Sequence, residues 1–489
     1  MVKSKKDFNK EKSIRRNLGV HLTSRDIFRD YIYNYIKDNL YHYLWIDLYA
    51  GEGNLILPIL NSIPKSKRIE FFSNHIFLFD IQKEMVKKCI KKAETYGIPR
   101  NIAERNIFLY DSLGEFPKFL NNKKFPIFHI TNPPYLYLGY IRKHKETQRH
   151  LKYFKNENDG YQDLYQIAMI NDLRNSVKNL IYIIPSNFIF GASISNKFRL
   201  DFLKYYNISK MYIFEKQIFK HTGTNICICF FKRKQKPLNN IIRFEGVKIK
   251  KENELNIEYC LKPEFKYRAG TEFNEFLNQF HTNKPLVVKY YLEKKEVINN
   301  QGSFPIDVID ANMYISNKYN DLKLNLNKQL SDKIRSNILY VRTVDTGGVA
   351  GRVGLYEIKK DFNVDGIYVS KATYRTSPIQ LFLEPKISIQ NQILLKEFFN
   401  FLLEYFRIKL DSEFLTTYKY SSAKYTRRYL GLIQVRQLIE TFPLLSLDNN
   451  QKKVFRYLVK NKNFLKLEEF LISISFGNNT NIMCFLENN

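Results

Sequence analysis

The chain has 489 residues, 44% of them hydrophobic, and its 78 Lys and Arg against 48 Asp and Glu give a net charge of +30. This length allows two or three domains, and the basic excess indicates a polyanionic partner, most simply nucleic acid. No apolar run approaches the roughly 20 residues of a membrane-spanning helix, and residues 1–16 lack the apolar stretch of a secretory signal. Because none of the five cysteines forms a C-x-x-C pair, we expect a reduced, cytoplasmic protein without zinc or another metal.

Apolar runs alternate with helix-like stretches, such as Lys83–Ala93, through the first half of the chain. This alternation predicts an α/β fold with a doubly wound, mostly parallel, seven-stranded Rossmann-like sheet. Ligands of such sheets bind outside the carboxyl ends of the strands. The predicted strands are Leu44–Leu48, Ile76–Phe79, Ile107–Tyr110, Ile127–Thr131, Ile181–Ile184, Met211–Phe214 and Ile226–Phe231.

The alternation is lost after the basic run Lys232–Lys234, from about Ile241 onward. We therefore place a domain boundary near residue 240, between a first domain of residues 1–240 and a mixed α+β second domain of residues 241–489. The second domain has a glycine turn at Gly347-Gly348 and a predicted helix over Leu394–Leu410. A further division near residue 390 is an alternative.

Polar side chains follow successive predicted strands. In the segment after the first strand, Gly51 and Gly53 let the backbone approach a ligand closely, although the lysine of a P-loop and the third glycine of a dinucleotide fingerprint are missing. Asp80 ends the second strand, where a carboxylate suits the two hydroxyls of a ribose. Asp111-Ser112 follow the third strand and could accept an adenine amino group. Each residue alone could be a turn or helix cap, but together they predict a nucleoside site.

Asn132-Pro133-Pro134-Tyr135 follows the fourth predicted strand. An aromatic amino group is a poor nucleophile because its lone pair is delocalised into the ring. The Asn132 amide oxygen and the Pro133 carbonyl could accept its hydrogens and so free that lone pair, in a loop that proline stiffens. Tyr135 offers a flat face for stacking a base. The alternative is a strand-to-loop turn, in which Asn and Pro are ordinary residues.

These motifs, spread over residues 19–231, resemble the S-adenosylmethionine-dependent DNA adenine-N6 methyltransferases, in the γ motif order of type II restriction–modification enzymes. In that order the cofactor motifs precede the tetrad and a target-recognition domain follows. The resemblance implies a catalytic domain over residues 1–240 and a DNA target-recognition domain over residues 241–489. It also implies S-adenosyl-L-methionine as the cofactor, and methyl transfer to N6 of an adenine flipped out of double-stranded DNA.

Several site residues follow only from this resemblance. Gly19–Ser24 is similar to the motif that holds the methionine moiety, although Leu22 and Ser24 replace the more usual aromatic residue and proline. Asp163–Tyr165 matches a motif that lines the pocket, and Pro185–Phe188 follows the fifth strand as in the family. The implied catalytic residues are Asn132, Pro133, Pro134, Tyr135 and Phe219, where Phe219 would pack against the extruded base or, alternatively, belong to a core. The implied cofactor-binding residues are Thr23, Asp47, Tyr49, Gly51, Gly53, Asp80, Ile81, Asp111, Ser112 and Asn132.

Basic residues lie where contacts with DNA are expected. One group follows the tetrad closely, where we expect phosphate contacts rather than only a solvated face. Tyr418–Arg428 mixes basic, polar and aromatic residues and more loosely resembles recognition segments of the family, with a basic surface turn as the alternative. The DNA-binding candidates are Arg142, Lys143, Lys145, Arg149, Arg342, Arg352, Lys424, Arg427 and Arg428.

Other functions use the same tetrad. Enzymes that methylate adenine in ribosomal RNA, or a glutamine in a release factor, can carry it; the large basic second domain favours DNA over protein, and RNA stays open. A DNA-binding subunit with a vestigial cofactor pocket is the non-enzymatic alternative, against which the intact Asp80 and Asp111 argue. Because the motifs begin near Gly19 and the second half shows no acid, acid-x-Lys cluster, we expect methylation without cleavage. The enzyme would be solitary or paired with a separate restriction endonuclease.

Overall fold

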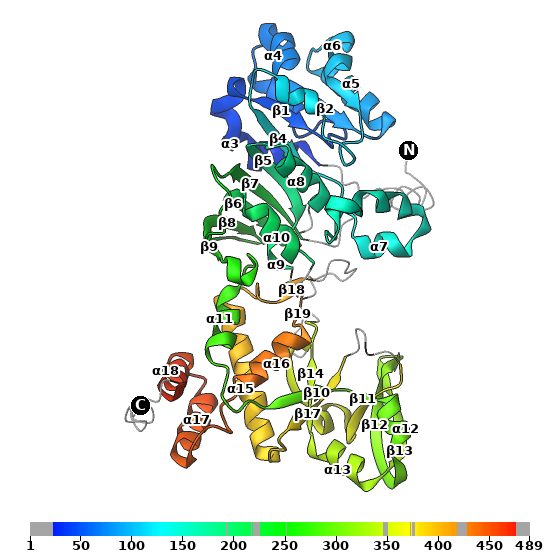
Figure 1. Cartoon of the computed structure of the whole chain (residues 1–489), viewed down its shortest axis with the longest axis vertical. Helices are drawn as coiled ribbons and strands as arrows, with labels where there is room; N and C mark the ends of the chain where they lie inside the picture. Colours follow the sequence, from blue (N-terminus) through cyan, green and yellow to red (C-terminus); the bar gives the residue numbers. More distant parts are fainter. Residues whose placement is uncertain are drawn as a thin grey trace. The chain divides into compact units, whose positions relative to one another are not determined.

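The computed structural model describes residues 23–191, 194–216, 218, 225–250, 252–345, 351–371, 373, 377–417 and 428–475. The described residues form two compact units, one ending at Ala269 and the other beginning at Gly270 (Figure 1). Among the described residues, no helix is both long and apolar enough to cross a bilayer.

A nine-stranded sheet runs through the first unit in the order β3-β2-β1-β4-β5-β7-β6-β8-β9. Strands β3, β2, β1, β4 and β5 are mutually parallel, and β7 lies antiparallel between β5 and β6. All seven predicted strands are present in it. The strands are β1 (Leu44–Asp47), β2 (Ile76–Asp80), β3 (Ile107–Leu109), β4 (Ile127–Thr131), β5 (Asn179–Pro185), β6 (Tyr206–Phe214), β7 (Ile226–Arg233), β8 (Ile242–Ile249) and β9 (Glu254–Leu261).

Two strands extend the sheet beyond the predicted seven. Strand β8 pairs parallel with β6 and antiparallel with β9, so the first unit continues past residue 240 to Ala269. The loss of βα alternation near Ile241 therefore does not coincide with the end of this unit. A hairpin added at a sheet edge contains no helix, and for that reason it looks like the start of a new domain in the sequence.

Side chains of the central strands alternate between two cores. On β5, Leu180, Tyr182 and Ile184 belong to one core, whereas Ile181 and Ile183 belong to the other. Burial on both faces explains why the strands read as continuous apolar runs. The first core packs on α8 (Leu164–Arg174), α9 (Asn187–Phe190) and α10 (Asn196–Leu203). The second packs on α2 (Arg25–Ile27), α3 (Tyr33–Ile36), α4 (Arg68–His75), α5 (Lys83–Thr95) and α6 (Arg100–Asn106).

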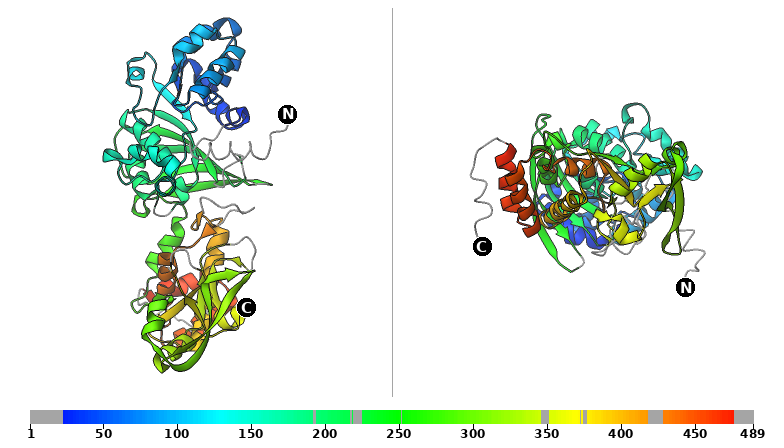
Figure 2. Two further views of the ribbon diagram at one scale, coloured as in Figure 1. Left: turned by 90° about the vertical axis from the view of Figure 1, so that its right-hand side faces the viewer. Right: turned by 90° about the horizontal axis from the view of Figure 1, so that it is seen from below.

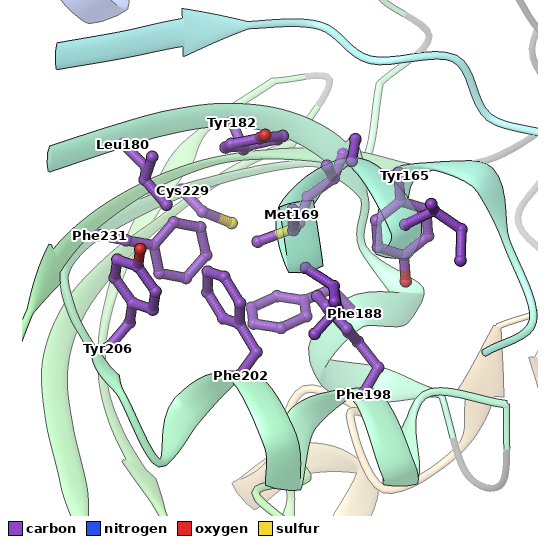
Figure 3. Close-up of a cluster of buried hydrophobic side chains, with 14 of the residues drawn as sticks. Tyr165, Met169, Leu180, Tyr182, Phe188, Phe198, Phe202, Tyr206, Cys229 and Phe231 are labelled. Atoms are coloured by element: carbon purple, nitrogen blue, oxygen red, sulfur yellow. The ribbon is translucent and has the colours of Figure 1, made fainter. Parts of the chain in front are cut away.

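Aromatic rings dominate the core on the α8 and α10 side (Figure 3). Phe202 stacks on Tyr206 with ring centroids 4.4 Å apart, and on Phe198 with centroids 5.4 Å apart. Cys227 and Cys229 are fully buried in the same core, with their sulfurs 3.4 Å apart. The two cysteines thus pack on one face of a strand, as predicted.

The second unit is a mixed α+β structure (Figures 1 and 2). It has two four-stranded sheets, in the orders β10-β17-β14-β15 and β11-β16-β12-β13, and a two-stranded sheet of β18 and β19. The strands are β10 (Val287–Tyr290), β11 (Leu292–Glu293), β12 (Gln301–Ile315), β13 (Lys318–Leu326), β14 (Leu339–Arg342), β15 (Gly354–Glu357), β16 (Gly366–Val369), β17 (Ile379–Glu384), β18 (Thr416–Thr417) and β19 (Arg428–Tyr429).

Helices of the second unit pack around one large core, and the unit also contains two smaller clusters of buried residues. Helix α15 spans Ile389–Lys409, close to the predicted Leu394–Leu410. The core includes residues on both sides of residue 390, such as Leu381 and Leu395, so no division occurs there. The other helices are α11 (Thr271–Gln279), α12 (Lys294–Asn299), α13 (Lys328–Ser336), α14 (Ile358–Phe362), α16 (Leu432–Glu440), α17 (Asn449–Asn461) and α18 (Phe464–Ser475).

Candidate active site

A cavity opens at the carboxyl ends of β1, β2, β3 and β4, the edge at which the sequence placed a nucleoside site. The space between its lining residues is about 870 Å³, a figure that includes open solvent at its mouth. Four segments far apart in the chain therefore meet at one place. The predicted site residues that line it are Thr23, Asp47, Tyr49, Gly51, Asp80, Ile81, Asp111, Ser112, Asn132 and Pro134.

The turn after β1 is tied to the end of β2. The Gly51 amide donates to Asp80 Oδ2 at 2.9 Å, and the Gln82 amide donates to Asp80 Oδ1 at 2.8 Å. Gly51 has a φ of 53° and Gly53 a φ of 77°, in the left-handed region that favours glycine. Burial raises the pKa of Asp80, while the two amide donors act in the opposite direction. Since each carboxylate oxygen has two lone pairs, Asp80 keeps acceptor sites for a ligand.

Asp47 also stabilises the turn after β1. Its Oδ1 accepts from the Tyr49 amide at 2.9 Å and from the Thr131 hydroxyl at 2.5 Å. The side chain is buried, and this burial raises the pKa of Asp47 to about 6. Asp47 thus joins the ends of β1 and β4, and its position explains why a carboxylate stands at the end of a buried strand.

A buried polar network lies beneath this turn, and no local pattern in the sequence indicated it. His129 Nε2 accepts from the Leu48 amide at 3.1 Å, so Nδ1 carries the proton and donates to Asp172 Oδ2 at 2.6 Å. The Tyr182 hydroxyl donates to the same Asp172 oxygen at 2.6 Å. Because all three side chains are fully buried, the network fixes the backbone where β1 ends.

Asp111 lines the cavity after β3, and side chains of the segment after the tetrad donate hydrogen bonds to it. Its oxygens accept from the Tyr153 hydroxyl at 2.8 and 3.0 Å and from the Lys152 ammonium at 3.1 Å. Ser112 beside it is buried, and its hydroxyl has no hydrogen-bond partner. Ile81 exposes 56% of its surface at the cavity. A polar end with an unsatisfied hydroxyl and an exposed aliphatic side chain suits the edge and the face of a purine.

The tetrad closes the cavity on the β4 side. The Asn132 amide Nδ2 donates to the Thr23 hydroxyl at 2.9 Å, which turns Oδ1 toward Tyr135. The Tyr135 hydroxyl contacts both Asn132 Oδ1 and the Ile183 carbonyl, the latter at 2.6 Å. Asn132 is thus held on two sides, and Pro134 lines the cavity next to it.

Tyr135 differs from the prediction in its exposure. Only 8% of its surface is accessible, because the ring packs in the core with Leu136 and Leu138. In this structure the ring presents little surface for stacking a base, and its hydroxyl positions Asn132 instead. The sequence predicted an aromatic platform at Tyr135 and did not indicate its contact with Asn132.

The basic residues after the tetrad are exposed, as contacts with phosphates would require. Arg142 and Lys143 end α7 (Leu138–Lys143), and Lys145 and Arg149 lie on the following 3-10 segment η6 (Lys145–Phe154). This part of the chain also reaches the cavity, because His150 and Tyr153 line it. The sequence did not single out either residue, although Tyr153 follows the basic run by only a few positions.

The candidates in the second unit are engaged with neighbouring groups. Arg352 Nη1 contacts both carboxylate oxygens of Glu404 at 2.7 and 2.8 Å. The Arg342 guanidinium lies 4.9 Å from the centre of the Tyr356 ring, and Arg428 donates to the Asp411 carbonyl at 3.2 Å. Their roles in DNA binding stay predictions. Phe219, Lys424 and Arg427 lie outside the described residues.

Of the motifs that the resemblance supplied, Leu164 lines the cavity beside the tetrad. Asp163 does not line it, but its Oδ1 accepts from the Leu136 amide at 2.9 Å and thereby fixes the loop after Tyr135.

Two residues that contact the site were not among the predicted site residues, Asn54 and Lys92. Asn54 Nδ2 donates to the Thr23 carbonyl at 2.8 Å, and Lys92 contacts Asn54 Oδ1.

Comparison with known proteins finds a family model that matches part of the first unit. Residues 41–219 match the family model described as Eco57I restriction-modification methylase. No curated protein sequence matches the chain significantly.

Among solved structures, the Type IIL restriction-modification enzyme MmeI in complex with DNA matches with a TM-score of 0.50 at 12% identity, over 96% of this chain and 73% of that chain. A modification subunit of a putative type I restriction enzyme from Vibrio vulnificus YJ016 matches with a TM-score of 0.35 at 13% identity, over 72% of this chain and 64% of that one. The DrdV–DNA complex matches with a TM-score of 0.37 at 14% identity, over 52% of this chain and 32% of the DrdV chain. The chain thus spans less than two thirds of the latter two proteins. The likeness to MmeI supports a methyltransferase-like fold.

Proposed function

We propose that this chain, which matches the Eco57I restriction-modification methylase family model over residues 41–219, methylates the N6 amino group of adenine in duplex DNA. The observation that carries the proposal is that Asn132 and Pro134 line the same cavity as Asp80 and Asp111. A site for a nucleoside-bearing cofactor and a site that polarises an aromatic amino group are therefore contiguous.

The cavity fits S-adenosyl-L-methionine. The remaining lone pairs of Asp80 suit the two ribose hydroxyls, and Asp111 with the unpartnered Ser112 hydroxyl suits the polar edge of the adenine. Ile81 would pack on the purine face, since much of its side chain is exposed at the cavity. Asp47 and Thr23 lie nearer the tetrad and would border the methionine moiety. When bound, this cofactor supplies an electrophilic methyl group on a sulfonium.

Asn132 and Pro133 prepare the accepting nitrogen. The Asn132 carboxamide oxygen has two lone pairs, so it can accept from Tyr135 and from a substrate amino group together. The Pro133 carbonyl would accept the second hydrogen of that amino group. Both contacts draw the nitrogen toward tetrahedral geometry and strengthen as its positive charge develops, which is the condition for catalysis.

The target adenine must leave the DNA helix to reach this site, at a cost of a few kcal/mol. Phe219 is proposed to stack on the extruded base, which would offset about 1–3 kcal/mol of that cost. The exposed cations after the tetrad are proposed to contact phosphates, and the second unit to read sequence with Arg342, Arg352, Lys424, Arg427 and Arg428. The net charge of +30 supports a nucleic acid as the substrate.

The test is methyl transfer from labelled S-adenosyl-L-methionine to duplex DNA, structured RNA and a protein mixture, followed by mass spectrometry of the digested products. The proposal predicts N6-methyladenine in DNA. Methylation confined to RNA, to protein or to cytosine would contradict it. A protein that binds no S-adenosyl-L-methionine by calorimetry would support the vestigial alternative instead.

A further inference from the structure

The segment that follows the tetrad forms an arm between β4 and α8. We call residues 138–158 the post-tetrad arm; it comprises α7, η6 and the short 3-10 turn η7 (Asn156–Asn158). Its base is closed by the Leu138 amide, which donates to the Gln162 carbonyl at 2.9 Å. At its far end, Arg174 on α8 donates to Asn158 Oδ1 at 2.8 Å. The arm is therefore anchored at one end to the loop that precedes α8 and at the other end to α8 itself.

One side of the arm reaches the cofactor cavity. The Tyr153 hydroxyl and the Lys152 ammonium both contact the carboxylate of Asp111, and His150 lines the cavity with Tyr153. Tyr153 is buried, and its pKa is raised to about 12, first by burial and then by the hydrogen bond to Asp111. The hydroxyl therefore remains protonated at neutral pH and can only donate to Asp111. The Tyr153 hydroxyl is therefore a fixed hydrogen-bond donor to Asp111, the residue proposed to bind the adenine of the cofactor.

The other side of the arm carries exposed cations. Arg142, Lys143, Lys145 and Arg149 are all exposed, and they lie within the twelve positions that precede Tyr153. No acidic residue other than Glu146 lies among them. The same short segment thus joins a cationic surface to a wall of the cavity.

We propose that the post-tetrad arm positions the cofactor through Tyr153 and Lys152, so that cofactor and DNA bind the enzyme more tightly together than apart. This inference rests on the proposed function, and it deepens that function by assigning a regulation to its site. Phosphates bound to the exposed cations hold the arm, and the held arm keeps Asp111 oriented toward the adenine of the cofactor.

Tyr153 and Lys152 both contribute to the orientation of the Asp111 carboxylate. The Asp111 carboxylate accepts from three donors: the Tyr153 hydroxyl, which contacts both of its oxygens, the Lys152 ammonium, and the Gly114 amide at 3.2 Å. These donors fix the orientation of the carboxylate that is proposed to meet the amino group. Coupling between two ligands is reciprocal, so DNA must raise cofactor affinity by the same factor by which cofactor raises DNA affinity.

The experiment measures the affinity of the full-length protein for S-adenosylhomocysteine by calorimetry, with and without sheared genomic DNA. The variants are Tyr153→Phe, which removes only the hydroxyl, and Lys152→Ala. Lys155→Ala is the matched control, because Lys155 is exposed on the same arm, whereas the ion pair with Asp111 comes from Lys152. Lys152→Arg tests whether a different cationic side chain at this position preserves the ion pair with Asp111.

We expect the wild type and Lys155→Ala to bind S-adenosylhomocysteine at least about fivefold more tightly when DNA is present. Tyr153→Phe and Lys152→Ala should bind it roughly 3- to 10-fold more weakly without DNA and should gain little from DNA. Lys152→Arg should recover most of the affinity.

Equal affinities of all four variants in both conditions would overturn the inference while leaving the proposed function intact, provided that the wild type methylates DNA. A wild type that binds no S-adenosylhomocysteine would instead overturn the proposed function, and this inference with it.

Discussion

Asn132 donates a hydrogen bond from its side-chain amide to the hydroxyl of Thr23, 2.9 Å away, across 109 positions of sequence. This contact joins the segment before the first strand to the tetrad and sets which end of the amide faces Tyr135. The orientation of the carboxamide oxygen is central to the proposed chemistry, because that oxygen accepts a hydrogen from the substrate amino group. Thr23 is thus a positioning residue for Asn132.

Replacing Thr23 with Val should slow methyl transfer. The substitution keeps the shape of the side chain and removes the acceptor for Asn132 Nδ2, so the amide loses one of its two anchors. We expect kcat to fall about 3- to 10-fold, which corresponds to one neutral hydrogen bond. Thr23→Ser keeps the hydroxyl and should retain most of the activity, whereas equal losses in both variants would show that the hydroxyl is not what matters.

Replacing Asp80 with Asn should weaken cofactor binding. The carboxylate accepts from the Gly51 and Gln82 amides, and an amide side chain can satisfy only one of them. We expect the Kd for S-adenosyl-L-methionine to rise about 10-fold or more, since hydrogen bonds to a charged group are involved. Glu84→Gln removes the same charge from an exposed position on α5 and should leave the Kd unchanged. A Kd for Asp80→Asn equal to that of the control would refute the assignment.

The buried Asp47 makes stability depend on pH. Its pKa is about 6 in the folded protein, above the ordinary 3.8. Between these two values the folded state binds more protons than the unfolded state, so stability falls as pH rises through this window and is level above it. Asp47→Asn has no such charge to bury. Relative to the wild type, this variant should therefore gain about 2 kcal/mol in unfolding free energy between about pH 4.5 and about pH 7.

Urea titrations of both proteins at the two pH values measure this gain. Asn can still accept from the Tyr49 amide and the Thr131 hydroxyl, so the comparison isolates the charge. A difference between the two proteins that stays constant with pH would show that Asp47 is ionised at little cost in the folded state.

A side chain at Gly53, in the turn after β1, should lower the free energy of unfolding. A Cβ there would lie 2.7 Å from Leu57 Cδ1 and 2.8 Å from Cys89 Sγ, at a φ of +77°. Gly97 also has a positive φ, +88°, but a Cβ there would meet nothing within 4 Å. Gly97→Ala should therefore cost about 1–2 kcal/mol from backbone strain alone, and Gly53→Ala about 1–3 kcal/mol more from overpacking. Equal losses in urea unfolding would contradict the crowding at Gly53.

Removing two cations from the post-tetrad arm should lower the salt dependence of DNA binding. We expect Arg142→Ala with Lys143→Ala to reduce the slope of log K against log salt concentration by about 0.9 for each phosphate that is no longer neutralised. The matched control is Arg105→Ala with Lys178→Ala, because these exposed residues precede β3 and β5 at the opposite edge of the sheet. Binding isotherms over a range of salt concentrations measure both slopes. An equal change in the two double variants would mean that the arm does not bind phosphate specifically.

Local patterns in the sequence were sufficient to predict the first seven strands of the chain and the residues at their ends. Gly51, Asp80, Asp111 and Asn132 meet at one cavity because parallel strands bring their carboxyl ends to one edge. The β8–β9 hairpin was not recognised as part of this sheet, since half of the residues of the edge strand β9 are exposed and β9 carries no continuous apolar run.

Contacts between side chains that are far apart in the sequence could not be predicted from local patterns. Tyr153 and Asp111 are 42 positions apart, and nothing in either segment indicates that one will meet the other. The burial of Tyr135 likewise depends on how the residues after the tetrad pack into the core. The role of Phe219 stays a prediction, as do those of Lys424 and Arg427.

The central claim is that Asn132 activates an adenine amino group, and the most direct measurement compares Asn132→Ala with the wild type. The account predicts that the variant binds DNA within about twofold of the wild type. Its rate of N6-methyladenine formation, followed by mass spectrometry of the DNA, should fall on the order of 100-fold or more. An Asn132→Ala protein that methylates adenine at a near-normal rate would contradict the account.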